Sequence, residues 1–150
     1  MTAAPAPAPA PAPALDQLSV GTTLPTLTVH FTRERLVRYA GASTDFNPIH
    51  YSEHYASRVG LPGVIAHGLL TMGTALRVVT DWVGDPVKVR SYFVRFTKPV
   101  VVPDTADGVE VVFTAKVSAI DGSLVTIAID AVCDEVKVLG AAKAEVDLGS

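Results

Sequence analysis

Asp45 and His50 lie five residues apart, on either side of the dipeptide Asn47-Pro48. Because Pro48 disfavours a helical conformation at Asn47, the chain should turn here and bring the two side chains together. A carboxylate and an imidazole that share one water molecule can transfer protons near neutral pH, and such groups contribute roughly 10²–10⁴-fold to a rate. Asp and Asn-Pro are also ordinary turn formers, and His50 could satisfy a buried carbonyl, so a purely structural role stays open.

Gly68 follows His50 by eighteen residues and opens the most apolar part of the chain. The first N–H groups of a helix have no internal partner and carry partial positive charge. A glycine there would let a thioester carbonyl approach the backbone, so that developing enolate charge is stabilised, although close helix–sheet packing is an alternative reason for it. His67 is expected to orient this helix start or, more simply, to cap it. His30 and His54 are expected to be ordinary surface or strand-end residues.

The composition indicates a globular domain. The chain has 150 residues, of which 49% are hydrophobic and 18% charged, so it can bury roughly two-thirds of its unfolded surface. A net charge of −3 gives no case for nucleic-acid binding, and the single cysteine, Cys133, excludes an internal disulfide. Arg77 and Asp81 interrupt the apolar run, which argues against a membrane span. Without a signal-peptide pattern at the N-terminus, we expect a soluble cytoplasmic protein.

Alanine and proline alternate strictly from Ala4 to Ala14. Each proline fixes its own φ and disfavours helix at the residue before it, so we expect residues 1–14 to form an extended, disordered arm. An inert tail is the simpler interpretation and a docking tether the alternative. The folded domain is then expected over residues 15–148.

Helical periodicity and capping signals predict three helices, over residues 32–40, 52–60 and 67–83. Thr32 and Ser52 are suitable N-caps, and Gly41 and Gly84 suit the exits of the first and third helices. The third helix is so apolar that other elements must cover most of its sides.

The period of the apolar residues changes from 3.6 to 2 after the third helix. One extended segment is expected at residues 22–30, and four strands are predicted at 87–97, 109–119, 125–133 and 136–146. A slip in the apolar phase predicts a bulge near Ser91, and Asp121-Gly122 predicts a tight hairpin. The expected fold is α+β: an antiparallel sheet wrapped around one long central helix, with an edge or face free for a second copy.

The sequence also resembles a known family over residues 15–148. The resemblance rests on Tyr39-Ala40-Gly41 leading into DFNPIH, and on GVIAHGLLTMG, DWVGDP and VRFTKPV. These segments resemble the MaoC-like (R)-specific hydratase/dehydratase family of the hotdog fold. Within it, they are most similar to the catalytic B-type subunits of (3R)-hydroxyacyl-acyl-carrier-protein dehydratases of actinobacterial fatty acid synthesis.

This resemblance implies a lyase that reversibly hydrates trans-2-enoyl thioesters to (3R)-3-hydroxyacyl thioesters. Asp45 and His50 would be the catalytic pair, Gly68 the oxyanion site, and Asn47 would shape the loop. The acyl group would be carried on coenzyme A or acyl carrier protein, with no metal or redox cofactor. The family implies a homodimer, or a heterodimer with another hotdog chain. A hotdog thioesterase and a non-catalytic or heterodimeric subunit are the alternatives, and acyl-chain length, carrier and physiological direction stay open.

Overall fold

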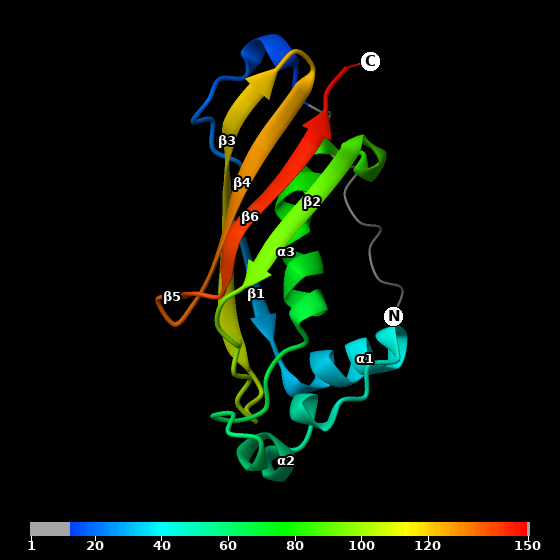
Figure 1. Cartoon of the computed structure of the whole chain (residues 1–150), viewed down its shortest axis with the longest axis vertical. Coiled ribbons are helices and arrows are strands. Elements are labelled where there is room, and N and C mark those ends of the chain that lie inside the picture. Colours follow the sequence, from blue (N-terminus) through cyan, green and yellow to red (C-terminus); the bar gives the residue numbers. More distant parts are fainter. Residues whose placement is uncertain (1–12, 150) are drawn as a thin grey trace.

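The computed structural model describes residues 13–149 as an antiparallel sheet curved around one long helix (Figure 1). The strand order is β1-β3-β4-β6-β2, and the short strand β5 pairs with β4. The strands are β1 (Leu27–Phe31), β2 (Val89–Phe96), β3 (Val109–Asp121), β4 (Leu124–Cys133), β5 (Val136–Lys137) and β6 (Leu139–Asp147). This arrangement confirms the predicted α+β class. The predicted Ala-Pro arm, residues 1–14, lies outside the described residues except for its last two.

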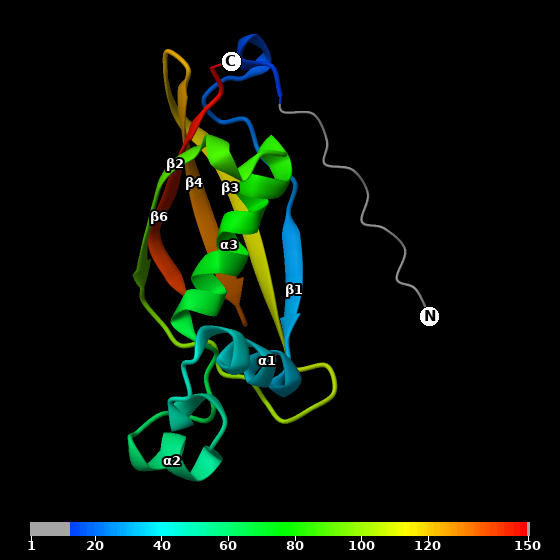
Figure 2. The same ribbon diagram turned by 90° about the vertical axis from the view of Figure 1, so that its right-hand side faces the viewer.

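The central helix α3 (Gly68–Val83) lies across one face of the sheet, as Figure 2 shows. Its buried residues are Thr71, Thr74, Ala75, Val78, Val79 and Val83. Alternate residues of β3 and β4 are buried as well, including Phe113 and Ile127. Each large apolar side chain that leaves water contributes roughly 1.5–3 kcal/mol, so this layer is the main source of stability. Within residues 13–149, no helix combines the length and the apolar character needed to cross a membrane.

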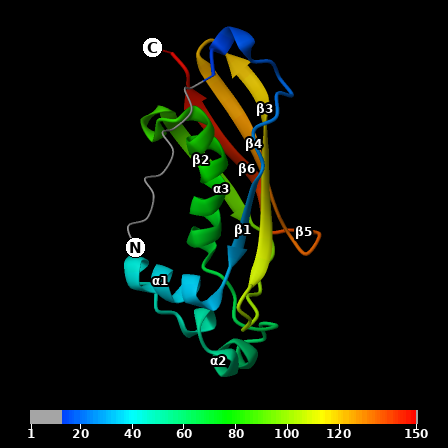
Figure 3. The same ribbon diagram turned by 180° about the vertical axis from the view of Figure 1, so that it is seen from behind.

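The segment between β1 and α3 lies beyond the N-terminal end of α3, at one end of the sheet (Figures 1 and 3). It contains α1 (Arg33–Ser43), a 3₁₀ helix (Pro48–His50) and α2 (Glu53–Arg58). The Arg33 guanidinium joins these elements, because it pairs with Glu53 and also donates to the carbonyl of Val102, 2.6 Å away. This contact ties the start of α1 to the start of α2, the two helices that precede and follow the loop with the candidate acid–base pair.

Three of the four predicted helix ends follow their sequence signals, including the exit of α3 at Gly84, and one does not. The Thr32 and Ser52 side chains accept backbone N–H groups and cap α1 and α2, as predicted. The predicted exit at Gly41 is wrong: α1 continues to Ser43, and Thr44 takes the left-handed conformation at φ 61°. A glycine inside a helix costs only about 1 kcal/mol, which packing of the helix can offset.

The first predicted strand is too long at its start. The expected segment 22–30 forms a strand only from Leu27 onward. Thr23 makes an isolated bridge to Lys116 instead. Pro25 lies between the two, and a proline has no N–H for a sheet ladder, which explains the interruption.

Within the described residues, the structure has five strands after α3 where four were predicted, and some of their limits differ as well. The segment 136–146 divides into β5 and β6, and Ala141, within β6, has a positive φ of 49°. The strand expected from residue 87 begins at Val89, because a 3₁₀ helix precedes it. A register shift between Val89 and Ser91 confirms the predicted bulge. Gly122 takes φ 58° in the tight β3–β4 hairpin, also as predicted.

Candidate active site

The loop after α1 positions Asp45 and His50 through its own hydrogen bonds. The Asn47 side chain accepts the N–H of Ile49 at 3.2 Å and thereby caps the 3₁₀ helix that ends at His50. The backbone N–H of Asn47 donates to Oδ1 of Asp45, also at 3.2 Å. Asn47 therefore orders this loop, and the two side chains predicted from spacing do come together.

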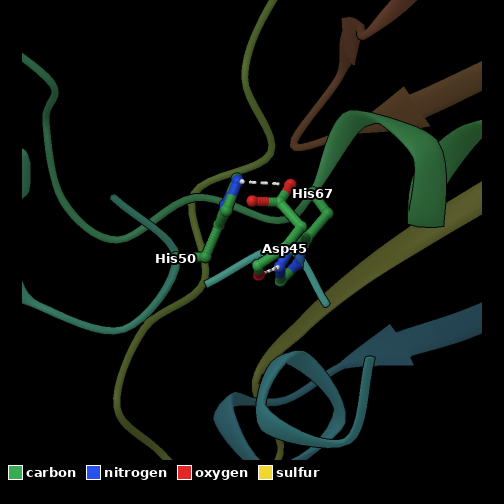
Figure 4. Close-up of side chains that lie close together, drawn as sticks. All are labelled: Asp45, His50 and His67. Carbon is green, nitrogen blue, oxygen red and sulfur yellow. Dashed lines mark hydrogen bonds and ion pairs between the residues drawn. The ribbon is translucent and has the colours of Figure 1, made fainter. Parts of the chain in front are cut away.

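Asp45 Oδ2 lies 3.8 Å from Nε2 of His50 (Figure 4). Nδ1 of His50 is 2.7 Å from the Ile65 carbonyl, which can only accept, so this nitrogen carries a proton. In the neutral ring, Nε2 then presents its lone pair toward the carboxylate. A separation of 3.8 Å is too long for a direct hydrogen bond but suits one oxygen atom that bonds to both groups. The His50 side chain is 8% exposed and that of Asp45 49%, so substrate can reach the pair from the Asp45 side.

His67 joins this pair as a third side chain. It is 1% exposed, its Nε2 lies 3.1 Å from the Asp45 carbonyl, and its ring stacks on that of His50 at 3.8 Å between centroids. Burial lowers the pKa of His67, and the nearby His50 lowers it further, while the bond to Asp45 and the Asp45 charge act in the opposite direction. His67 occupies the N-cap position of α3, but its side chain makes no capping bond, so the simpler sequence interpretation is wrong.

Gly68 begins α3 and shares a pocket of about 430 Å³ with His50. Thr71, Phe96 and Lys98 also line this pocket. A Cβ at Gly68 would lie 3.2 Å from the Phe96 ring, which is tighter than an ordinary contact. The glycine thus serves helix–sheet packing, and it also leaves the helix start open to a ligand carbonyl. Phe96 and Lys98 were not singled out from the sequence, because their contact with this pocket arises only when β2 meets the start of α3.

His50 also borders a second cavity, of about 260 Å³, on the side of α1. Its other lining residues are Leu36, Val37, Ala40, Phe46 and Tyr51. Apolar and aromatic side chains therefore line this side of the imidazole, and Val37, Phe46 and Tyr51 are more than half exposed there.

The cluster of Asp45, His50 and His67 could in principle bind a metal ion, because one ligand atom from each lies within 4.8 Å of the others. The two imidazole rings are stacked, with planes 22° apart. Lone pairs lie in the ring planes, so stacked rings direct them side by side and not toward one ion. One nitrogen of each ring also bonds a backbone carbonyl. The arrangement suits proton transfer better than metal binding.

Comparison with known proteins agrees with this fold. The family model described as MaoC like domain matches residues 17–131. The chain is 39% identical over 82 residues to 3-hydroxyacyl-thioester dehydratase X of Mycobacterium tuberculosis, covering 55% of this chain and 28% of that protein. It is 30% identical over 108 residues to the 3-oxo-4,17-pregnadiene-20-carboxyl-CoA hydratase beta subunit of the same organism, covering 72% and 80%.

A solved structure titled MaoC-like dehydratase superposes with a TM-score of 0.88 at 36% identity, covering 92% of this chain and 43% of that one. The chain thus spans less than half of this structure and of dehydratase X, but most of the hydratase beta subunit. The match over residues 17–131 and the shared architecture make this chain a member of the MaoC-like domain family, as its sequence motifs predicted.

Proposed function

We propose that this protein is a hydro-lyase that reversibly adds water to trans-2-enoyl thioesters to give (3R)-3-hydroxyacyl thioesters. The observation that supports this most directly is the Asp45–His50 pair, spaced for one bridging oxygen, with His50 lining the same pocket as Gly68. The names of two relatives, a hydroxyacyl-thioester dehydratase and a CoA hydratase subunit, favour the same reaction class.

In the hydration direction, the thioester carbonyl would face the backbone N–H groups at the start of α3. A water held between Asp45 and His50 gives one proton to the pair, and its oxygen forms a bond to Cβ. The electrons of the C=C bond move toward the carbonyl oxygen, where the N–H groups stabilise the enolate. The pair then delivers one proton to Cα, which completes the net addition of one water, and dehydration is the reverse. Each oxyanion donor of this kind is typically worth about 10²–10³-fold in kcat.

The direct test follows the loss of enoyl-thioester absorbance with crotonyl-CoA and longer acyl-CoAs. Asp45→Asn and His50→Ala should each lower kcat by at least about 10²-fold, because each removes one proton-transferring group. His30→Gln serves as the control, since His30 is exposed and its contacts are with Asp107 and Glu110, away from the acid–base pair. Activity retained in both active-site variants would reject the assigned roles. Release of free thiol without hydration would select the thioesterase alternative.

We also propose that the enzyme works with a second hotdog chain, either another copy or a different subunit. The word "subunit" in the name of one relative supports this assembly. Strand β2 forms one edge of the sheet, and Phe93 and Phe96 are about half-exposed there. Light scattering of the purified chain distinguishes the cases: a dimer supports self-association, whereas an inactive monomer that gains activity with a second hotdog chain supports a heterodimer.

We also propose the limits of the domain, the compartment in which the protein acts and the carrier of the substrate. The domain would extend over residues 15–148, the protein would act in the cytoplasm, and the substrate would arrive on coenzyme A or on the phosphopantetheine of an acyl carrier protein.

The proposed reaction steps use only side chains and backbone N–H groups, so we propose that the reaction needs no metal or redox cofactor. Treatment with a chelator should therefore leave the hydration rate unchanged.

A further inference from the structure

His67 contacts both members of the acid–base pair, although the proposed mechanism gives it no step. Its Nε2 lies 3.1 Å from the backbone carbonyl of Asp45, and its ring stacks on His50 with a 3.8 Å centroid separation (Figure 4). The Tyr39 ring meets it edge-on at 4.8 Å. These three groups surround an imidazole that is almost fully buried.

The contacts of His67 fix its protonation state. A carbonyl oxygen can only accept, so Nε2 of His67 carries the proton. Its Nδ1 is buried and, among the described residues, has no hydrogen-bond partner. A neutral ring leaves only a lone pair at that position, whereas a charged ring would bury an unsatisfied N–H and place a cation against His50. Burial also lowers the pKa of His67, in agreement with a neutral ring.

We propose that His67 is a positioning residue of this active site, which anchors the Asp45 backbone through Nε2–H and supports the face of the His50 ring. The inference rests on the proposed hydro-lyase function and assigns a task to a residue that the reaction steps leave unused. Asp45 needs such an anchor because its side chain is half-exposed and lies 3.8 Å from its partner. A neutral ring is also required, since His50 carries a positive charge whenever it holds the transferred proton, and a second cation in contact would oppose that charge.

Two substitutions separate the two contacts. His67→Phe keeps an aromatic face against His50 but loses the hydrogen bond to the Asp45 carbonyl. His67→Gln keeps an N–H donor near the position of Nε2 but loses the ring. His30→Gln is the matched control, because His30 also contacts a backbone carbonyl, that of Asp107 at 3.0 Å, but lies on the surface.

The hydration assay gives kcat and KM for each variant, with kcat expressed per folded molecule. In His67→Phe, we expect kcat to fall by about 10- to 100-fold, because small displacements of catalytic groups have effects of this size. Its KM for crotonyl-CoA should stay within about twofold of the wild-type value, because His67 is not among the residues that line the pocket shared by His50 and Gly68. His67→Gln should recover part of the kcat lost in His67→Phe, because it keeps an N–H donor for the Asp45 carbonyl, and His30→Gln should match the wild type.

A purely structural role would lower the activity only in proportion to the folded fraction, and kcat per folded molecule would stay at the wild-type value. That result in His67→Phe, or a kcat within about twofold of the wild type, overturns the proposal. Thermal unfolding of each variant, measured beside the kinetics, supplies the folded fraction.

Nitrogen-15 NMR of the histidine rings gives a readout that does not depend on activity. The chain has four histidines, so their ring signals can be assigned by substitution. We expect His67 to stay neutral and protonated at Nε2 between about pH 6 and pH 8, and a charged or Nδ1-protonated ring would overturn the proposal. A wild type that stays inactive both alone and with a second hotdog chain, but keeps this neutral ring and the Asp45 contact, would reject the hydro-lyase function but not the anchoring contact.

Discussion

Water reaches the two members of the Asp45–His50 pair unequally, and this difference fits a reaction that consumes or releases water. The Asp45 carboxylate is half-exposed and can receive a water molecule from solvent, whereas His50 is buried and held by the Ile65 carbonyl. A buried imidazole with one nitrogen fixed as a donor has its lone pair aimed in a single direction. The residues thus combine an open carboxylate with a rigidly oriented base.

The role of Gly68 can be tested against another glycine of the same helix. In Gly68→Ala, the new Cβ would lie 3.2 Å from the Phe96 ring, at the helix start where the proposed mechanism places the thioester carbonyl. We expect kcat to fall by about 10²-fold, the size of effect typical for loss of an oxyanion donor. Gly73→Ala is the control: within residues 13–149, no heavy atom outside its chain neighbours and its own helix backbone lies within 4 Å of its Cβ position, so it should retain activity and gain up to about 1 kcal/mol of helix stability.

A double variant distinguishes a steric effect of the new methyl group on Phe96 from an effect on the proposed oxyanion site at Gly68. Phe96→Leu combined with Gly68→Ala relieves the contact with the aromatic ring but keeps the methyl group at the helix start. Recovery of stability without recovery of kcat agrees with the oxyanion role. Full recovery of kcat would show that the glycine serves packing alone.

At the residue scale, the sequence predicted which residues form the acid–base pair better than it predicted how their side chains are oriented. The spacing of Asp45 and His50 identified the pair, because a turn within five residues is a local property. The partner of His50 is the carbonyl of Ile65, fifteen residues away, and no pattern marks a backbone carbonyl. His67 was expected to cap a helix, and only the tertiary contact between the helix start and the Asp45 loop reveals its bond to a different segment.

At the scale of elements, the short 3₁₀ helix is the part that connects local structure to chemistry. Asn47→Ala removes the acceptor for the Ile49 N–H, so the free energy of unfolding should fall by roughly 0.5–2 kcal/mol, and kcat should fall because His50 ends this helix. Asn47→Ser keeps a side-chain oxygen and should recover most of both losses. Urea unfolding and the hydration assay on the same samples give the two values.

Thr32, the N-cap of α1, provides the comparison for Asn47, the N-cap of the 3₁₀ helix. Thr32→Ala removes the equivalent bond to the Arg35 N–H at the start of α1 and should cost a similar free energy of unfolding. Its kcat per folded molecule should not change, because Thr32 touches neither Asp45 nor His50. Equal loss of kcat in Thr32→Ala and Asn47→Ala would mean that Asn47 acts only through stability.

Whether a segment forms a helix or a strand was predictable where one sequence signal dominated. The residues at which each element begins and ends were not. The helix over residues 67–83 was correct because its apolar residues persist through many turns. The predicted exit at Gly41 was wrong because a glycine permits, but does not require, a left-handed conformation, which Thr44 adopts instead. The division between β5 and β6 depends on pairing with neighbouring strands, and pairing partners are not encoded in the alternation of one strand.

At the scale of the whole molecule, the sheet and helix share one buried apolar core that includes Cys133. This thiol lies at the end of β4, pairs with Val111 and Val136 across the sheet, and is buried. Burial, together with the nearby Asp134 charge, raises the pKa of Cys133 to about 11. At pH 8 only about one thiol in a thousand would be the reactive thiolate, so the folded protein should react very slowly with a thiol reagent.

In urea the same thiol should react quickly, because the unfolded chain restores both access and an ordinary pKa near 8.5. The labelling rate of the native protein at pH 8 should then follow the population of globally open molecules, and Val79→Ala, which removes a buried side chain between α3 and the sheet, should raise it. Val37→Ala, on the exposed side of α1, is the control and should label like the wild type. Rapid labelling of the native wild type would mean that the β4 end of the sheet opens locally, so that Cys133 does not report on the central layer.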